Sequence, residues 1–152
     1  MRLANDILHG AIAGAAGTTA LNAATYLDMA ARGRSSSTAP EEAAEKLAEK
    51  GSVRIPGDQE ARRNRLSGLG ALNGIASGVA VGAALGALRS AGWRPGSLSN
   101  AVIAALGAMA FTDGVMSVLG VTDPRDWSIT DWASDIVPHL AYGVVTAVAL
   151  ER

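Results

Sequence analysis

Four polar residues lie within or beside long stretches of the sequence that contain no Asp, Glu, Lys or Arg. They are Asn22, Asn73, Asp113 and His139. A carboxyl group and an imidazole can exchange protons or bind a cation, and amide side chains can complete a hydrogen-bonded layer around them. Inside a membrane such groups are costly, so they are expected to face a partner or a cavity. The sequence therefore predicts either a polar clasp that fixes the register of the helices or a proton site.

The depth of these four residues supports a single layer. Counting inward from the expected helix ends places Asn22, Asn73, Asp113 and His139 roughly 13, 10, 12 and 9 Å deep at 1.5 Å per residue. These residues are far apart in the sequence, and each belongs to a different expected helix. We therefore expect Asp113 and His139 to contact directly or through water, with the two asparagines completing the layer.

Other chemistry finds little support. Asp131, Asp135 and His139 share one helical face and could form the corner of a hard-metal site, but such spacing is common by accident. The chain has no cysteine, and we find no phosphate-binding loop, dinucleotide fingerprint, nucleophile elbow or HExxH motif. We therefore expect no enzymatic activity, no cofactor and no metal. A formal charge of -1 argues against nucleic acid as a partner.

A ladder of glycines is the most specific pattern in the chain. Gly70, Gly74, Gly78, Gly82 and Gly86 recur every four residues, and Gly10 and Gly14 form a shorter version. Missing side chains allow another helix backbone to approach closely, so the ladder predicts helix packing. Four residues turn a helix through 400°, and the ladder therefore drifts by about 40° per step. We expect either a right-handed crossing near -40° or different partners at its two ends.

The elements that position these residues are long apolar helices. A bilayer core needs roughly 20 apolar helical residues, and four windows approach or meet that length. They are about 7–31, 66–88, 98–121 and 133–150. We expect an all-α, polytopic membrane protein with four transmembrane helices in one compact bundle. Two alternatives remain open: three spans with one re-entrant or surface helix, and a soluble Ala-rich bundle, although the windows lack the polar outer faces of a soluble protein.

The only substantial segment outside the spans is the loop 32–65. It is expected to hold a short amphipathic helix at about 40–50, started by a capping box of Thr38 and Glu41. A helix from Gln59 should run on into the second span, and Thr130 should cap the last one.

Charges at the helix ends predict one ion pair and the orientation. Asp28 and Arg32 have the i,i+4 spacing of an interfacial ion pair. The loop also holds most of the Lys and Arg residues, so the positive-inside rule places it in the cytoplasm and both termini outside.

Two short motifs carry a resemblance to known proteins. The stretch from His9-Gly-Ala-Ile-Ala-Gly14 through Thr19, Asn22 and Tyr26, with Pro138-His139-Leu-Ala-Tyr142-Gly143, resembles small four-helix bacterial inner-membrane proteins of unknown function. The whole chain is similar to an uncharacterised actinobacterial integral membrane protein. The resemblance implies a four-helix fold in the inner (plasma) membrane and implies no activity.

Two functions from different classes follow. The first is helix association mediated by glycine, either with a second copy or as an accessory subunit of a larger membrane complex. The second is a small proton-coupled or ion transporter that uses Asp113 and His139. A lipid-modifying enzyme has less support, because Arg62, Arg63 and Arg65 have no base near them in the sequence and suit a positive-inside anchor. The expected partners are the lipid bilayer and another membrane protein or copy.

Overall fold

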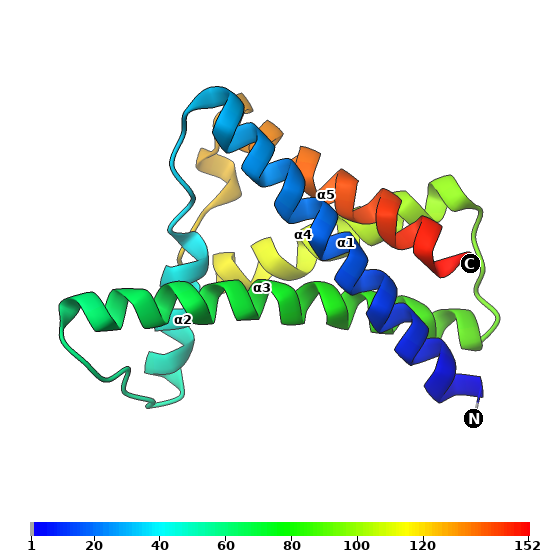
Figure 1. Ribbon diagram of the computed structural model, residues 1–152, viewed down its shortest axis with the longest axis horizontal. Helices are drawn as coiled ribbons and strands as arrows, with labels where there is room; N and C mark the ends of the chain where they lie inside the picture. The colour runs from blue at the N-terminus through cyan, green and yellow to red at the C-terminus, as the bar shows by residue number, and fades with distance from the viewer. Residues whose placement is uncertain (1) are drawn as a thin grey trace.

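The computed structural model describes residues 2–152, and in that range its secondary structure consists of helices, without strands. The elements are α1 (Arg2–Arg32), α2 (Ala39–Lys50), α3 (Gln59–Ser90), α4 (Ser97–Val118), the short 3-10 helix η1 (Pro124–Asp126) and α5 (Ile129–Leu150). The four long helices run along the molecule, and the two ends of the chain lie at the same end of the bundle (Figure 1). We call this the termini end, and the opposite one the loop end. The all-helical prediction is therefore confirmed.

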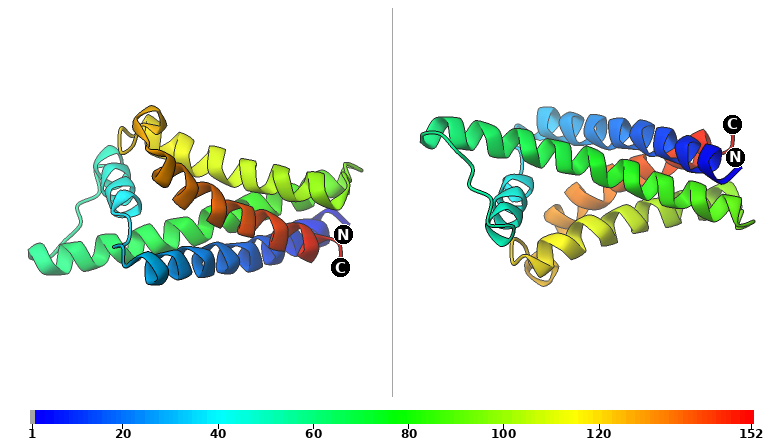
Figure 2. Two further views of the ribbon diagram at one scale, coloured as in Figure 1. Left: turned by 90° about the horizontal axis from the view of Figure 1, so that it is seen from above. Right: turned by 90° about the horizontal axis from the view of Figure 1, so that it is seen from below.

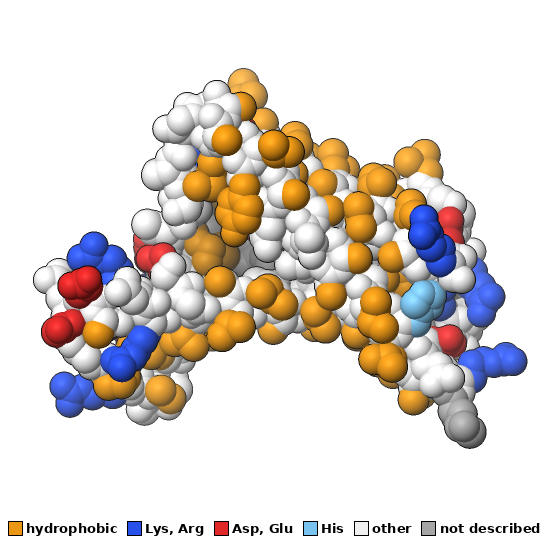
Figure 3. Space-filling model, viewed as in Figure 1, with side chains coloured by type: hydrophobic (Ala, Val, Ile, Leu, Met, Phe, Trp, Pro, Cys, Tyr) orange, Lys and Arg blue, Asp and Glu red, His pale blue; other side chains and the backbone are white. Residues whose placement is uncertain are grey.

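Three helices in the described range are long and apolar enough to cross a membrane, namely α3, α4 and α5. Many large apolar side chains on the long helices are exposed, including Leu98, Val118 and Ile129 at 80%, 83% and 89%. Hydrophobic side chains cover the middle of the visible face, whereas charged side chains gather at its two ends (Figure 3). This surface is that of a multi-pass membrane protein. Helix α1 is long enough, but its Gly, Thr, Asn and His residues lower its mean hydropathy, and it is not among these three candidate spans.

The bounds of two spans differ from the prediction because local caps decide them. Helix α4 ends at Val118 rather than near residue 121, and a turn follows in which Gly120 has the left-handed φ of 69°. Helix α5 begins at Ile129 rather than near 133. Ser128 caps it through a reciprocal capping box with Asp131, so the prediction of Thr130 as the cap was wrong.

The start of the loop helix was also predicted incorrectly. Thr38 has helical backbone angles, and its hydroxyl donates to the Glu42 carboxylate at 2.8 Å instead of capping a backbone N–H. The expected capping box with Glu41 is therefore wrong, although α2 itself occupies the expected range. The continuous helix from Gln59 is confirmed, with Asp58 accepting a hydrogen bond from the Ala61 N–H at 2.8 Å.

The long helices pack in the order α3, α1, α5 and α4. Helix α1 crosses α3 near the termini end and also lies along α5, while α4 packs mainly against α5 (Figures 1 and 2). The core is built largely of small side chains, with a few larger ones between them. Its buried members are Ala13, Leu85, Ala104, Ala108, Tyr142 and Leu150. Helix α2 lies across the loop end, between the start of α3 and the connection from α4 to α5 (Figure 2).

Candidate functional site

Backbone contact between α1 and α3 holds the termini end of the bundle together. A Cβ atom added to Gly82 would lie 2.6 Å from Gly14 Cα, and one added to Gly10 would lie 2.9 Å from Gly86 Cα. Real Cβ atoms essentially never come this close to backbone. The two helices can therefore approach this closely only because both carry glycine at these positions.

The glycine ladder meets different neighbours along its length. Gly78 lies against Thr18 and Tyr142, whereas a Cβ at Gly70 would lie 2.8 Å from the carbonyl carbon of Pro40 in α2. Gly74, between them, has no neighbour within 4 Å of an added Cβ. The drift of about 40° per step explains this change of partner. Because α1 occupies the ladder from Gly78 to Gly86, that part is not free for another chain.

Tyr142 joins α5 to the α1–α3 pair. Its hydroxyl donates to the Gly78 carbonyl at 2.7 Å, and the Thr146 hydroxyl donates to the Ala13 carbonyl at 3.5 Å. Tyr142 and Thr146 are both buried. The sequence patterns do not single out these two contacts, although polar side chains four residues apart in an apolar span are a signal that could have found them. On its other side α5 meets α4, where Gly143 lies against Ala105.

A second group of polar side chains lies toward the loop end, between α4 and α5. His139 has a side chain only 10% exposed, its Nδ1 lies 2.9 Å from the backbone oxygen of Asp135, and it lies 3.3 Å from Asp135 Oδ1. A carbonyl oxygen can only accept, so Nδ1 carries a proton and donates it. In the neutral ring Nε2 is then left with a lone pair, which can accept a proton.

Asp113 of α4 joins this group. It lies near enough to Asp135 and His139 for their charges to interact, and its Oδ1 is 3.5 Å from the Thr112 hydroxyl. We call Asp113, Asp135 and His139 the α4–α5 polar cluster. In the described part of the chain no direct hydrogen bond joins Asp113 to His139, and Asp135 Oδ2 is buried without a hydrogen-bond partner. The sequence prediction named two members of the cluster and left Asp135 out of the layer.

The helix contacts also give the level of the two asparagines. Along each helix from the level at which Gly78 meets Tyr142 and Thr18, His139 lies about 4.5 Å, Asn22 about 6 Å and Asn73 about 7.5 Å toward the loop end. Both asparagines are half-buried, and neither makes a side-chain hydrogen bond within residues 2–152. They reach the level of His139 but do not close the layer with hydrogen bonds.

Helices α3 and α4 diverge at this level. A Cβ at Gly107 of α4 would lie 3.9 Å from Val81 of α3. Seven residues further toward the loop end on each antiparallel helix are Gly114 and Gly74, and an added Cβ at either would have no neighbour within 4 Å. Seven residues make about two helical turns. Gly74 and Gly114 therefore point in nearly the same directions as Val81 and Gly107, where the two helices are still in contact. We call the space beside them the α3–α4 opening; the surface is hollowed next to α3 at this end (Figure 3).

The metal corner considered from the sequence does not form. Within the described residues no group of three or more His, Asp or Glu side chains is arranged to hold a metal ion. The Asp131 carboxylate instead accepts from the Ser128 N–H at 2.9 Å and from its hydroxyl at 2.6 Å. Asp131 therefore stabilises the start of α5 and does not face His139 as a ligand.

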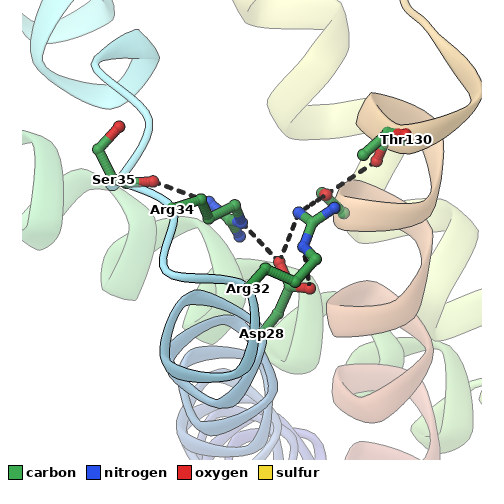
Figure 4. Close-up of polar contacts among 6 residues, drawn as sticks. Asp28, Arg32, Arg34, Ser35 and Thr130 are labelled. Carbon is green, nitrogen blue, oxygen red and sulfur yellow. Dashed lines mark hydrogen bonds and ion pairs between the residues drawn. The ribbon is translucent and has the colours of Figure 1, made fainter.

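A charged clamp closes α1 onto α5 at the loop end (Figure 4). The Arg32 guanidinium contacts both oxygens of Asp28 at 2.8 and 2.9 Å, which confirms the expected pair, and it donates to the Ser134 hydroxyl at 2.7 Å. Arg34 adds a further contact to Asp28 at 2.5 Å. Ser134 in turn donates to the Thr130 carbonyl at 2.8 Å. The clamp fixes the α1–α5 spacing beside the polar cluster.

Comparison with known proteins adds no further assignment. The chain matches no protein-family model, no curated protein and no solved structure. The candidate site is therefore defined by geometry alone.

Proposed function

We propose that the protein is a four-span protein of the inner (plasma) membrane that acts by helix association, with a second copy or as a subunit of a membrane complex. The three candidate spans support a multi-pass arrangement. Helix α1 has 31 residues and so reaches about 46 Å, and it packs along both α3 and α5, which supports its role as the fourth span. An even number of spans agrees with both termini lying at one end (Figure 1).

The observation that supports association is the α3–α4 opening. Gly74 and Gly114 leave two helix backbones uncovered inside the apolar part of the molecule. Uncovered glycines allow the close backbone approach that drives association of membrane helices. A helix from a second copy or from another membrane protein would fill this space and cover Asn73, which is otherwise only half-buried.

Paired glycine substitutions test this proposal. Gly74→Leu should fill the opening and reduce association, whereas Gly68→Leu should not. Gly68 also has open space around it but points in a different direction, since six residues separate the two positions on one helix. Native mass spectrometry in mild detergent, together with identification of copurifying proteins, gives the readout. A wild-type protein that is monomeric and has no partner would contradict the proposal.

A second candidate function is proton or cation transfer through the α4–α5 polar cluster. It is supported by the gathering of three ionisable side chains, His139, Asp135 and Asp113, and by the buried Oδ2 of Asp135, which has no hydrogen-bond partner in the described residues. Asp113→Asn should keep the fold and abolish proton uptake into proteoliposomes that carry a pH-sensitive dye. Asp126→Asn, at the exposed end of η1, is the matched control. Equal uptake by the wild type and Asp113→Asn would refute this candidate.

A further inference from the structure

A cavity of about 250 Å³ lies between α2 and the start of α3 at the loop end, and it is lined mostly by charged and polar side chains. Its two walls carry opposite charges. Helix α2 contributes Glu41, Glu42 and Glu45, and α3 contributes Arg62 and Arg63. Glu45 and Arg62 form an ion pair that joins the two helices. The cavity therefore has one acidic and one basic side.

Each wall keeps one charge that the protein does not pair. Glu41 and Arg63 make no side-chain hydrogen bond or ion pair within residues 2–152, whereas Glu42 accepts from the Thr38 hydroxyl at 2.8 Å. A guanidinium suits a phosphate group, and a carboxylate accepts hydrogen bonds from a primary ammonium group. Opposite charges on opposite walls therefore favour a zwitterionic ligand, with its ammonium group toward α2 and its phosphate toward α3.

The position of the cavity along α3 is that of lipid head groups. Leu66 also lines the cavity and begins the uncharged stretch 66–88. That stretch spans about 34 Å, close to the thickness of about 30 Å of a bilayer core. Arg62 lies one turn outside Leu66, or about 6 Å, and the head-group layer is about 5–8 Å thick on each side of a bilayer. The charged walls are therefore level with the phosphates of the leaflet at the loop end.

We propose that this cavity binds the head group of a phosphatidylethanolamine lipid. The Arg63 guanidinium contacts the phosphate, and the Glu41 carboxylate accepts from the ammonium group. The acyl chains follow α3 past Leu69, which is 41% exposed and lies about two turns from Arg62 on the same side of the helix. A choline head group has no N–H to donate, and a glycerol head group has no positive charge. This inference goes beyond the association proposal and needs only the membrane location that the candidate spans support.

Native mass spectrometry tests the preference for this head group. The protein in mild detergent is titrated with phosphatidylethanolamine, phosphatidylglycerol and phosphatidylcholine that share the same acyl chains, and the dissociation constant of the first bound lipid is measured. The wild type should bind phosphatidylethanolamine about two- to fivefold more tightly than the other two lipids, the change expected from one partly exposed ionic contact.

Substitutions in the two walls should have different effects. Arg63→Gln removes the phosphate contact and should weaken the binding of phosphatidylethanolamine and phosphatidylglycerol alike, by about two- to fivefold. Glu41→Gln removes only the ammonium contact and should abolish the preference for phosphatidylethanolamine over phosphatidylglycerol. Glu49→Gln and Arg54→Gln are the matched controls, because both side chains are exposed and neither lines the cavity. They should leave every dissociation constant unchanged.

Three results would overturn the proposal. The first is equal binding of the three lipids by the wild type, and the second is an unchanged preference in Glu41→Gln. The third comes from glycerophosphoethanolamine, which has the same head group without acyl chains. If it bound as tightly as the lipid, the cavity would belong to a soluble zwitterion; displacement of the lipid only at a large excess supports the lipid. None of these results depends on whether the protein associates with a second copy, so this proposal and the association proposal can fail separately.

Discussion

Replacing single glycines of the ladder by alanine should show whether a glycine stabilises the protein through close contact with α1 or whether its position on the helix makes no difference. Gly82→Ala and Gly74→Ala introduce the same methyl group into the same helix, two ladder steps apart. At Gly82 the new Cβ would lie 2.6 Å from Gly14 Cα and 2.7 Å from its nitrogen, whereas at Gly74 it would meet nothing within 4 Å. Backbone atoms cannot rotate away, so α1 and α3 must separate by about 1 Å to reach ordinary contact distance.

The magnitudes follow from two opposing terms. Overpacking of a closely packed interface costs about 1–3 kcal/mol, and contact with backbone on both sides points to the upper end of that range. Alanine in place of glycine within a helix stabilises it by about 0.8–1 kcal/mol at either position. We therefore expect Gly82→Ala to destabilise the protein by about 2 kcal/mol and Gly74→Ala to be neutral or stabilising by up to about 1 kcal/mol.

Equilibrium unfolding in mixed detergent micelles, followed by circular dichroism, provides the assay for both variants. The two free energies of unfolding should differ by about 2–3 kcal/mol, which is large compared with the error of such extrapolations. Equal stability of Gly82→Ala and Gly74→Ala would refute the reasoning. It would mean that α1 and α3 are not held in backbone contact in the membrane-like environment.

Three further results are expected. Tyr142→Phe removes the hydroxyl that donates to Gly78 and should lower the free energy of unfolding by about 0.5–1.5 kcal/mol in the same assay. The hydrogen bond from the Arg125 guanidinium lowers the pKa of Asp123 from its ordinary value of 3.8 to about 2. The ion pair should therefore be complete above pH 3.8 and be lost as the pH falls through about 2. Arg125→Gln should return the titration midpoint of the Asp123 carboxyl, measured by NMR, toward 3.8. Reporter fusions at Arg152 should read outside the cytoplasm, and a cytoplasmic reading would reverse the proposed orientation.

Most of the fold could be predicted because hydropathy and the absence of charge act over whole helices. The uncharged stretches locate the long helices, and Asp58 and Gly51 mark helix ends through local chemistry that a sequence displays. The errors came from competition between neighbouring caps. Ser128 and Thr130 are both residue types that cap helices, and only the geometry shows that α5 begins after Ser128, which pairs reciprocally with Asp131.

The candidate site could be predicted only in part, because helix rotation is not determined by depth. Counting residues places His139 and Asn22 at one level, but it does not tell which side chains face each other. Asp135 entered the sequence reasoning only as a possible metal ligand, yet it is the residue that both contacts His139 and lies near Asp113. The hydrogen bond from Tyr142 to Gly78 of α3 could not be predicted either, since it joins residues 64 positions apart in the sequence.

The drift of the glycine ladder accounts for both the closed and the open end of the bundle. Between Gly86 and Gly78 the ladder turns by about 80°, and over this range its glycines still contact α1 and, at Gly78, Tyr142 of α5. Another 40° carries Gly74 away from α1, and a further 40° turns Gly70 onto α2. A repeat of four residues, rather than the 3.5 of a coiled coil, therefore cannot hold one partner along the whole span. The same repeat that brings α1 into backbone contact with α3 therefore leaves α3 without a neighbouring helix at the level of Gly74.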